Sequence, residues 1–238
     1  MSTFLVVHGA FSGGWSWRRV GEILAAEGHT VFTPTLTGLG ERSHLASPDV
    51  SLSTHVEDIL AVLNFERLLG VTLVGHSYGG MVITGVAERA AERIEALIYV
   101  DALIPGDGQC LLDLLEPEAV ALVEEAAAAW GDGWKVPPTG DGDEREVPQP
   151  IKTFQERLRL ANPTAAALPR AYVACTGRDA IPSPVNASIE RIARRVEEEG
   201  WPVVKLAAGH SAQREKPFET AHAILEAARL ARPVRKAK

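Results

Sequence analysis

Residues 71–80, VTLVGHSYGG, decide the fold of this chain. An apolar run of four residues leads into the pattern G-x-S-x-G, with Ser77 at its centre. A buried strand, a sharp turn and a helix that begins near Gly79 are the setting in which such a serine is exposed for nucleophilic attack. A serine held at strained backbone angles needs small neighbours, which explains the two flanking glycines. The sequence therefore predicts a nucleophilic Ser77 on a strand–turn–helix unit.

Short apolar runs alternate with helical patterns along the rest of the chain. The six predicted strands are Thr3–Val7, Thr30–Thr33, Val71–Val74, Ala96–Val100, Ala171–Cys175 and Val203–Leu206. The predicted helices are Trp17–Glu27 ending at Gly28, a helix with a capping box at Thr54–Glu57 running to about Leu69, Gly79–Ala91, Ala187–Glu199 ending at Gly200, and Ala221–Leu230. Nearly continuous Val, Leu and Ile are typical of strands that helices cover on both faces. The alternation predicts an α/β fold with a mostly parallel, doubly wound sheet of about six strands.

The composition is that of a globular protein. The chain has 238 residues, of which 46% are hydrophobic, enough for one sizeable core. The net charge of −7 argues against a nucleic-acid surface. No run has the ~18 apolar residues of a membrane helix, and no signal-peptide pattern opens the chain. The two cysteines, Cys110 and Cys175, make no disulfide framework, so we expect free thiols and a cytoplasmic location.

Residues 103–168 interrupt the alternation of strands and helices. No strand is evident there, and helical patterns at Gln109–Leu115, Glu118–Trp130 and Ile151–Leu160 flank a loop rich in Pro, Gly and acidic residues. Because the helices carry apolar side chains that need burial, we expect a small helical cap over a core formed by residues 1–102 and 169–238. The apolar cap residues either line a substrate pocket or only pack the cap: Leu111, Leu114, Leu115, Trp130 and Trp134.

A serine nucleophile needs a general base, and the chain has seven histidines. His210 follows the last predicted strand, the usual place of the base in this kind of architecture, and Gly209 lets the loop turn. His222 lies within the last predicted helix, and His76 is expected to face the opposite side of the turn. His8 is expected to brace its own loop through hydrogen bonds. The sequence therefore predicts His210 as the base.

Two aspartates compete to orient this base. Asp179 follows the fifth predicted strand, and the chain order Ser77, Asp179, His210 is one that serine hydrolases use. Asp101, directly after the fourth predicted strand, is the alternative. We predict Asp179 as the acid and expect the other aspartate to brace a loop.

The loop after the first predicted strand, His8–Phe11, carries a second signal. Its backbone amides are placed to bind the oxyanion of a tetrahedral intermediate, together with the amide of Tyr78, the residue after the nucleophile. Phe11 and Ala10 are the two candidate donors from this loop, and the position in the turn favours Phe11.

Together these motifs resemble the α/β-hydrolases of the plant methyl-esterase and hydroxynitrile-lyase branch, above all its bacterial carboxylesterases. The resemblance rests on Val7–Ala10, Gly13–Trp15, Thr35–His44, Gly75–Met81, Thr176–Asp179 and Gly209–His210. It covers about residues 3–102 and 169–230 and is weak over the cap. It implies an α/β-hydrolase fold, and it implies Ala10, with Tyr78, as the oxyanion donors.

Two positions depart from the lyases of that branch. Ser211 stands where those lyases carry a lysine, and Ala10 stands where they carry a threonine. Without the lysine no cation lies beside a leaving cyanide, so cyanohydrin cleavage is disfavoured. The expected function is therefore hydrolysis of small, apolar carboxylic esters through an acyl-enzyme on Ser77, with His210 and Asp179, and without metal or organic cofactor. A carbon–carbon lyase and a non-catalytic ligand-binding protein are the alternatives, and a homodimer stays open.

Overall fold

The computed structural model describes residues 1–138, 143–177 and 184–232. Its centre is a six-stranded sheet with the order β2-β1-β3-β4-β7-β8. The strands are β1 (Thr3–Val7), β2 (Thr30–Phe32), β3 (Val71–His76), β4 (Ile94–Val100), β7 (Arg170–Cys175) and β8 (Val203–Leu206). All neighbours in this sheet are parallel, which confirms the predicted α/β architecture.

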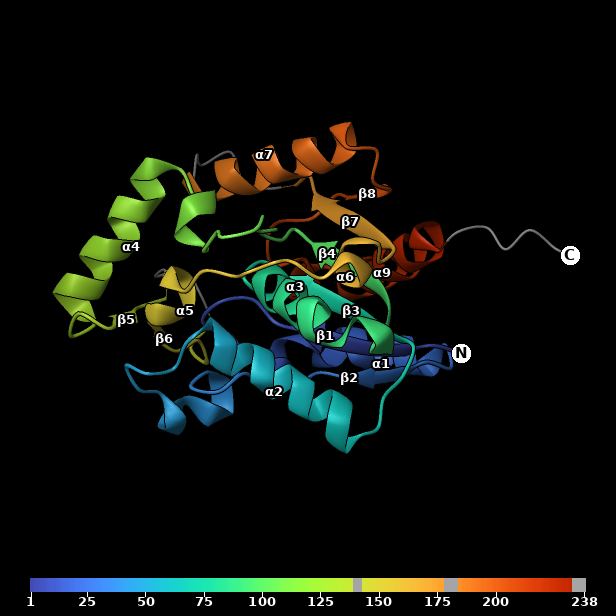
Figure 1. Ribbon diagram of the computed structural model, residues 1–238, viewed down its shortest axis with the longest axis horizontal. Coiled ribbons are helices and arrows are strands. Elements are labelled where there is room, and N and C mark those ends of the chain that lie inside the picture. The colour runs from blue at the N-terminus through green and yellow to red at the C-terminus, as the bar shows by residue number, and fades with distance from the viewer. Residues whose placement is uncertain (139–142, 178–183, 233–238) are drawn as a thin grey trace, which may run out of the picture.

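Helices cover both faces of the sheet (Figure 1). One face carries α1 (Arg18–Ala26) and α9 (Pro217–Ala231), and the other carries α2 (Leu52–Phe65), α3 (Gly79–Ala90) and α7 (Pro184–Glu198). Short helical elements connect them: η1 (Gly14–Trp17), η2 (Gly40–Leu45), η3 (Ala91–Arg93) and α8 (Ala212–Glu215).

Strand side chains alternate between two apolar clusters. Leu5 and Val7 of β1 pack into the cluster under α2, α3 and α7, whereas Phe4 and Val6 pack into the cluster under α1 and α9. Each such burial stabilises the fold by about 1.5–3 kcal/mol. The central strands β1, β3, β4 and β7 are continuous in apolar residues because helices cover both of their faces, whereas the edge strands β2 and β8 are partly exposed.

Two helix ends behave as predicted, and one helix is shifted. Gly28 and Gly200 follow α1 and α7 with left-handed φ angles of 85° and 81°. Helix α2, however, has its N-cap at Ser51, three residues before the predicted N-cap Thr54, and the amide of Ser51 donates to Thr54 Oγ1 over 3.2 Å. It ends at Phe65 rather than near Leu69, because Arg67 adopts a φ of 53° and closes the helix in a Schellman motif.

Residues 103–168 are here called the cap segment, and the described part of it, 103–138 and 143–168, contributes no strand to the six-stranded sheet. The segment contains η4 (Leu112–Leu114), α4 (Pro117–Trp130), β5 (Lys135–Val136), β6 (Gln149–Pro150), α5 (Lys152–Gln155) and α6 (Pro163–Ala166). The N-terminus lies at the right of Figure 1, so the strands run leftward and end towards α4, α5 and the β5–β6 pair.

Parts of the cap segment differ from the prediction. The expected helices Gln109–Leu115 and Ile151–Leu160 are reduced to η4 and α5, and the short strands β5 and β6 were not expected. The reason is a backbone pairing between distant parts of the segment. The amide of Leu158 donates to the carbonyl of Gln109 over 3.0 Å, and the amide of Gly108 donates to the carbonyl of Leu158 over 2.8 Å. Backbone groups committed to this pairing cannot also form helical hydrogen bonds.

Two further findings concern the chain as a whole. In the described ranges, no helix is both long and apolar enough to cross a bilayer. Cys110 and Cys175 are both buried and are not joined in a disulfide, as expected.

Candidate active site

Ser77 lies on the strained turn that the sequence predicts between β3 and α3. Its φ is 52°, a left-handed value that costs a non-glycine residue about 1–3 kcal/mol. The surrounding backbone holds this conformation: the Ser77 amide donates to the carbonyl of Val100 over 3.2 Å, and the Ser77 carbonyl accepts from the amide of Leu103 over 3.1 Å. A Cβ atom at Gly75 would lie 2.6 Å from the carbonyl oxygen of Gly79, so the turn closes only with glycine there.

The side chains of Ser77 and His210 are hydrogen-bonded to each other. Ser77 Oγ lies 3.0 Å from His210 Nε2, and the other ring nitrogen, Nδ1, lies 2.7 Å from Oδ2 of Asp101. An ionised carboxylate only accepts hydrogen bonds, so the proton of the neutral ring is on Nδ1. Nε2 is then left to accept the hydroxyl proton of Ser77. The structure thus brings together the predicted nucleophile and the predicted base.

Asp101 holds the place beside the base. It directly follows β4, is fully buried and has a φ of 45°. Its amide donates to the carbonyl of Val173 over 2.8 Å, and its Oδ1 accepts the amide of Cys175 over 3.1 Å. The sequence predicts Asp179 for this place, and Asp179 lies outside the described residues. The carboxylate that the structure brings to His210 is therefore the alternative, Asp101.

His76 supports the loop that carries the base. Its Nε2 lies 2.9 Å from the carbonyl oxygen of His210, and the two rings are 4.8 Å apart. The carbonyl can only accept, so Nε2 donates. Among the described residues, Nδ1 of His76 is buried without a hydrogen-bond partner. The sequence assigned no catalytic role to His76. Its contact with His210 could not be predicted, because the two residues are far apart in the chain.

The loop after β1 is held on both sides. His8 Nδ1 donates to the carbonyl of Gly9 over 2.8 Å, and His8 Nε2 accepts the amide of Leu36 over 3.1 Å. His8 therefore braces its loop, as predicted, and it orients the peptide unit whose N–H belongs to Ala10.

The three candidate oxyanion donors differ in what they bind. The amide of Phe11 donates to Oε1 of Gln149 over 3.0 Å. Across the part of the chain that the structure describes, the amides of Ala10 and Tyr78 have no hydrogen-bond acceptor. The side chain of Tyr78 is buried, and its hydroxyl lies 2.7 Å from His55 Nδ1.

Three buried histidines are held neutral around the site. Burial lowers the pKa of His8 and of His55 to about 4, and it lowers the pKa of His76 to about 3. Hydrogen bonds to the backbone oppose this effect for all three, but desolvation of the charged ring outweighs them. His55 has a fixed tautomer, because Nε2 donates to the carbonyl of Thr37 over 2.8 Å and leaves Nδ1 to accept from Tyr78.

These depressed pKa values predict acid destabilisation. At a pH between the folded and the unfolded pKa values, the unfolded chain binds more protons than the folded one. The stability that the neutral histidines contribute is therefore complete above about pH 6.5 and is lost as the pH falls towards 4. As the pH falls through this range, each histidine lowers the free energy of unfolding by up to about 1.4 kcal/mol per pH unit. Urea unfolding between pH 7 and pH 5 measures the slope. His55→Gln should flatten it and the same change at exposed His44 should not; equal slopes would contradict the prediction.

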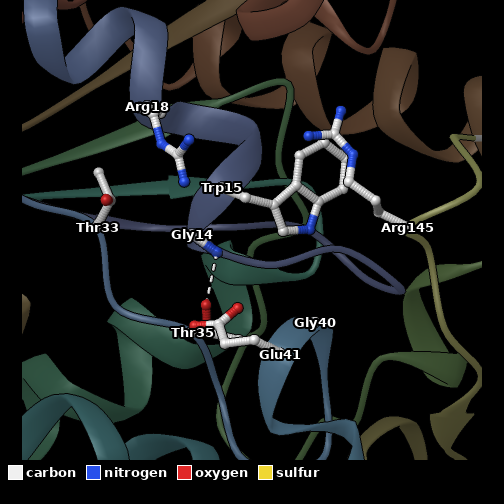
Figure 2. A pocket seen from close by; sticks show the side chains of 8 residues that line it. All are labelled: Gly14, Trp15, Arg18, Thr33, Thr35, Gly40, Glu41 and Arg145. Atoms are coloured by element: carbon white, nitrogen blue, oxygen red, sulfur yellow. Dashed lines mark hydrogen bonds between the residues drawn. The ribbon is translucent and has the colours of Figure 1, made fainter.

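A separate cavity of about 680 Å³ lies beside the loop after β1 (Figure 2). It is lined by Gly14, Trp15, Arg18, Thr33, Thr35, Gly40, Glu41 and Arg145. Neither Ser77 nor His210 is among these residues, so this cavity is not the place where an ester would meet the nucleophile. Within the described residues, no cluster of three or more His, Cys, Asp or Glu side chains is arranged to hold a metal ion.

Comparison with known families agrees with the fold. A model of the alpha/beta hydrolase family matches residues 4–223. The chain belongs to the α/β hydrolase family. This α/β hydrolase is 37% identical over 246 aligned positions to the carbendazim hydrolyzing esterase of Nocardioides sp. (strain SG-4G). The match covers 94% of this chain and 98% of that relative.

Other similarities are more partial. The hydrolase is 31% identical over 105 residues to methyl jasmonate esterase 1 of Vitis vinifera, a match that covers 43% of this chain and 40% of that protein. Its fold is shared with an extracellular alpha/beta-hydrolase from Paenibacillus species, with a TM-score of 0.79 at 22% identity, covering 95% of this chain and 99% of that one. Both of these sequence relatives are named esterases, and the chain is a carboxylesterase-like hydrolase.

One residue at the site of this hydrolase had no signal in the sequence. Gln149 lies in the Pro- and acid-rich part of the cap segment, in no motif, yet its side chain is fully buried and reaches the loop after β1. The contact joins residues 138 positions apart, so no local pattern could have indicated it.

Proposed function

We propose that this α/β hydrolase cleaves carboxylic esters through an acyl-enzyme, with Ser77 as nucleophile, His210 as base and Asp101 as the acid that orients the base. The observation that carries the proposal is the continuous set of hydrogen bonds from Ser77 Oγ to His210 Nε2, 3.0 Å, and from His210 Nδ1 to Asp101 Oδ2, 2.7 Å. Distances in this range allow direct proton transfer from the hydroxyl to the ring.

The geometry supports a two-step reaction. His210 Nε2 takes the proton of Ser77 as Oγ attacks the ester carbonyl, and the buried carboxylate of Asp101 stabilises the imidazolium that forms. The amides of Ala10 and Tyr78 donate to the oxyanion of the tetrahedral intermediate. His210 then protonates the leaving alcohol, and a water activated by His210 releases the acid and regenerates Ser77.

The substrate we propose is a small ester with an apolar acyl or alcohol part. Phe154 of the cap segment packs against Phe11 and Tyr78, with ring centres 6.2 Å and 5.7 Å apart, so aromatic surface lies close to the proposed oxyanion donors. Leu111, Leu114 and Leu115 are buried, whereas Trp130 is 82% exposed. A cytoplasmic location, the cap boundaries and a homodimer remain predictions from the sequence.

The test compares two reactions on one preparation near pH 7. We expect hydrolysis of short aryl esters, because charge develops on a carbonyl oxygen that the amides of Ala10 and Tyr78 can bind. We expect little or no cyanide release from mandelonitrile, because expelled cyanide needs a nearby cation and the residue after His210 is the neutral Ser211.

The control is the same pair of assays on Ser77→Ala, which measures the background turnover that does not depend on Ser77. Efficient mandelonitrile cleavage with negligible ester turnover would identify a lyase and overturn the proposal. Binding of aryl esters without turnover of any of them would instead identify a ligand-binding protein.

A further inference from the structure

The cap segment holds the loop after β1 through a short stretch, residues 143–149, here called the strap. The amide of Val147 donates to the carbonyl of Phe11 over 2.9 Å, and the amide of Phe11 donates to Oε1 of Gln149 over 3.0 Å. Both backbone groups of Phe11 are therefore bound by the strap. The φ of Phe11 is 64°, a strained value for a bulky residue, and these two bonds hold it there.

The side chain of Gln149 is itself fixed at both ends. It is fully buried in β6, and its Nε2 donates to Oγ1 of Thr153 over 2.8 Å. Thr153 Oγ1 in turn donates to the carbonyl of Pro150 over 2.7 Å, so it acts as an acceptor for Gln149. This chain of hydrogen bonds leaves Oε1 of Gln149 facing the amide of Phe11, with no freedom to exchange its two ends.

Ion pairs and a cation–π contact connect the strap to neighbouring segments. The guanidinium of Arg145 lies over the ring of Trp15, 3.8 Å from its centre, as Figure 2 shows. Arg145 also pairs with Asp143 over 2.7 Å. Arg214, on the short helix α8 that follows the base, lies 3.2 Å from Glu146 and 3.3 Å from Asp143. The strap thus connects the loop that follows β1 with the segment that follows the base.

We propose that Gln149 is a positioning residue for the oxyanion hole: by binding the Phe11 amide it keeps that amide out of the hole and fixes Ala10 as the donor from this loop. The inference rests on the proposed ester hydrolysis and extends it to a residue of the cap segment. Oxyanion stabilisation depends on donors that are held in place before charge develops. A loop donor displaced by about 1 Å through a more distant substitution can cost about 100-fold in rate.

The first experiment replaces Gln149 and measures aryl ester hydrolysis. Gln149→Met has nearly the same shape but offers the Phe11 amide no oxygen, and the same change at exposed Gln155 of the cap segment is the matched control. We expect kcat to fall about 10- to 100-fold in Gln149→Met with KM changed less than about threefold, and no change in Gln155→Met. Affinity for a trifluoromethyl ketone, whose adduct with Ser77 carries the oxyanion, should fall by the same factor as kcat/KM.

The second experiment needs no activity. Hydrogen–deuterium exchange at the Phe11 amide should be faster in Gln149→Met than in wild type and unchanged in Gln155→Met, because a hydrogen-bonded amide exchanges only when its bond opens. Gln149→Asn, whose shorter side chain does not reach Phe11, gives a second and milder variant if Gln149→Met folds poorly.

The outcomes separate the inference from the proposed function. A kcat within about twofold of wild type in both folded variants, or a raised KM with unchanged kcat, overturns the positioning role. If wild type hydrolyses no ester, the proposed function fails, and exchange at Phe11 alone decides whether Gln149 holds the loop. Unchanged exchange in that case overturns the inference as well.

Discussion

Ser77→Ala is expected to lower kcat for aryl ester hydrolysis by about 10⁴- to 10⁶-fold. The reason is that Ser77 supplies the nucleophilic oxygen of the covalent step. Its Oγ lies 3.0 Å from His210 Nε2, and without Oγ this nitrogen has no serine hydroxyl to activate. What activity remains should come from substrate binding and the backbone amides alone. Alanine accepts the left-handed turn about as well as serine, so the thermal midpoint should change little.

A fluorophosphonate probe identifies the nucleophile independently of turnover. Wild type should be labelled on Ser77, as peptide mass mapping would show, and Ser77→Ala should not be labelled. Ser43→Ala, at an exposed serine, is the matched control and should keep both activity and labelling. Complete inhibition with the label on a different residue would show that Ser77 is not the nucleophile.

Asp101→Asn is expected to lower kcat by about 10²- to 10⁴-fold. Asparagine can keep an oxygen towards the amide of Cys175, which now lies 3.1 Å from Oδ1, and this places its NH₂ group against Nδ1 of His210. An amide donor there forces the ring proton onto Nε2, and a protonated Nε2 can no longer accept the proton of Ser77. It also removes the negative charge that stabilises the imidazolium.

The matched comparison for Asp101→Asn is Asp179→Asn. With Asp101 as the acid, we expect kcat in Asp179→Asn to stay within about threefold of wild type. The two kcat values, measured with the same aryl ester and with thermal midpoints as a check on folding, decide between the carboxylates. A larger loss in Asp179→Asn than in Asp101→Asn would return the role to Asp179.

The choice between these aspartates shows why the sequence alone could not complete the site. Each follows a predicted strand, and each lies between Ser77 and His210 along the chain. In the sheet, β4 and β7 are parallel neighbours, so Asp101 and Thr176, which directly follow them, leave the sheet at the same edge. Which carboxylate meets the base then depends on backbone angles at the strand ends, such as the φ of 45° at Asp101, and no residue pattern encodes those angles.

The cap segment shows the same limit in its secondary structure. Helical periodicity predicted a helix over Ile151–Leu160, but the amide of Leu158 bonds to Gln109 across the segment instead. A periodic pattern reports only which side chains could be buried on one face. It does not report a backbone pairing between residues far apart in the chain, such as the hydrogen bond from the amide of Leu158 to the carbonyl of Gln109.

The sequence by itself determined the α/β sheet and its six strands, the family, and the turn that carries Ser77. These features rest on local signals: strands buried on both faces need continuous apolar runs, and a left-handed serine between β3 and α3 needs small neighbours. Only the tertiary structure decided that Asp101 faces His210, that Gln149 takes the Phe11 amide, and that His76 supports the base. Each of these contacts joins segments far apart in the chain, and each depends on angles and distances that are set when the sheet, its loops and the cap segment pack together.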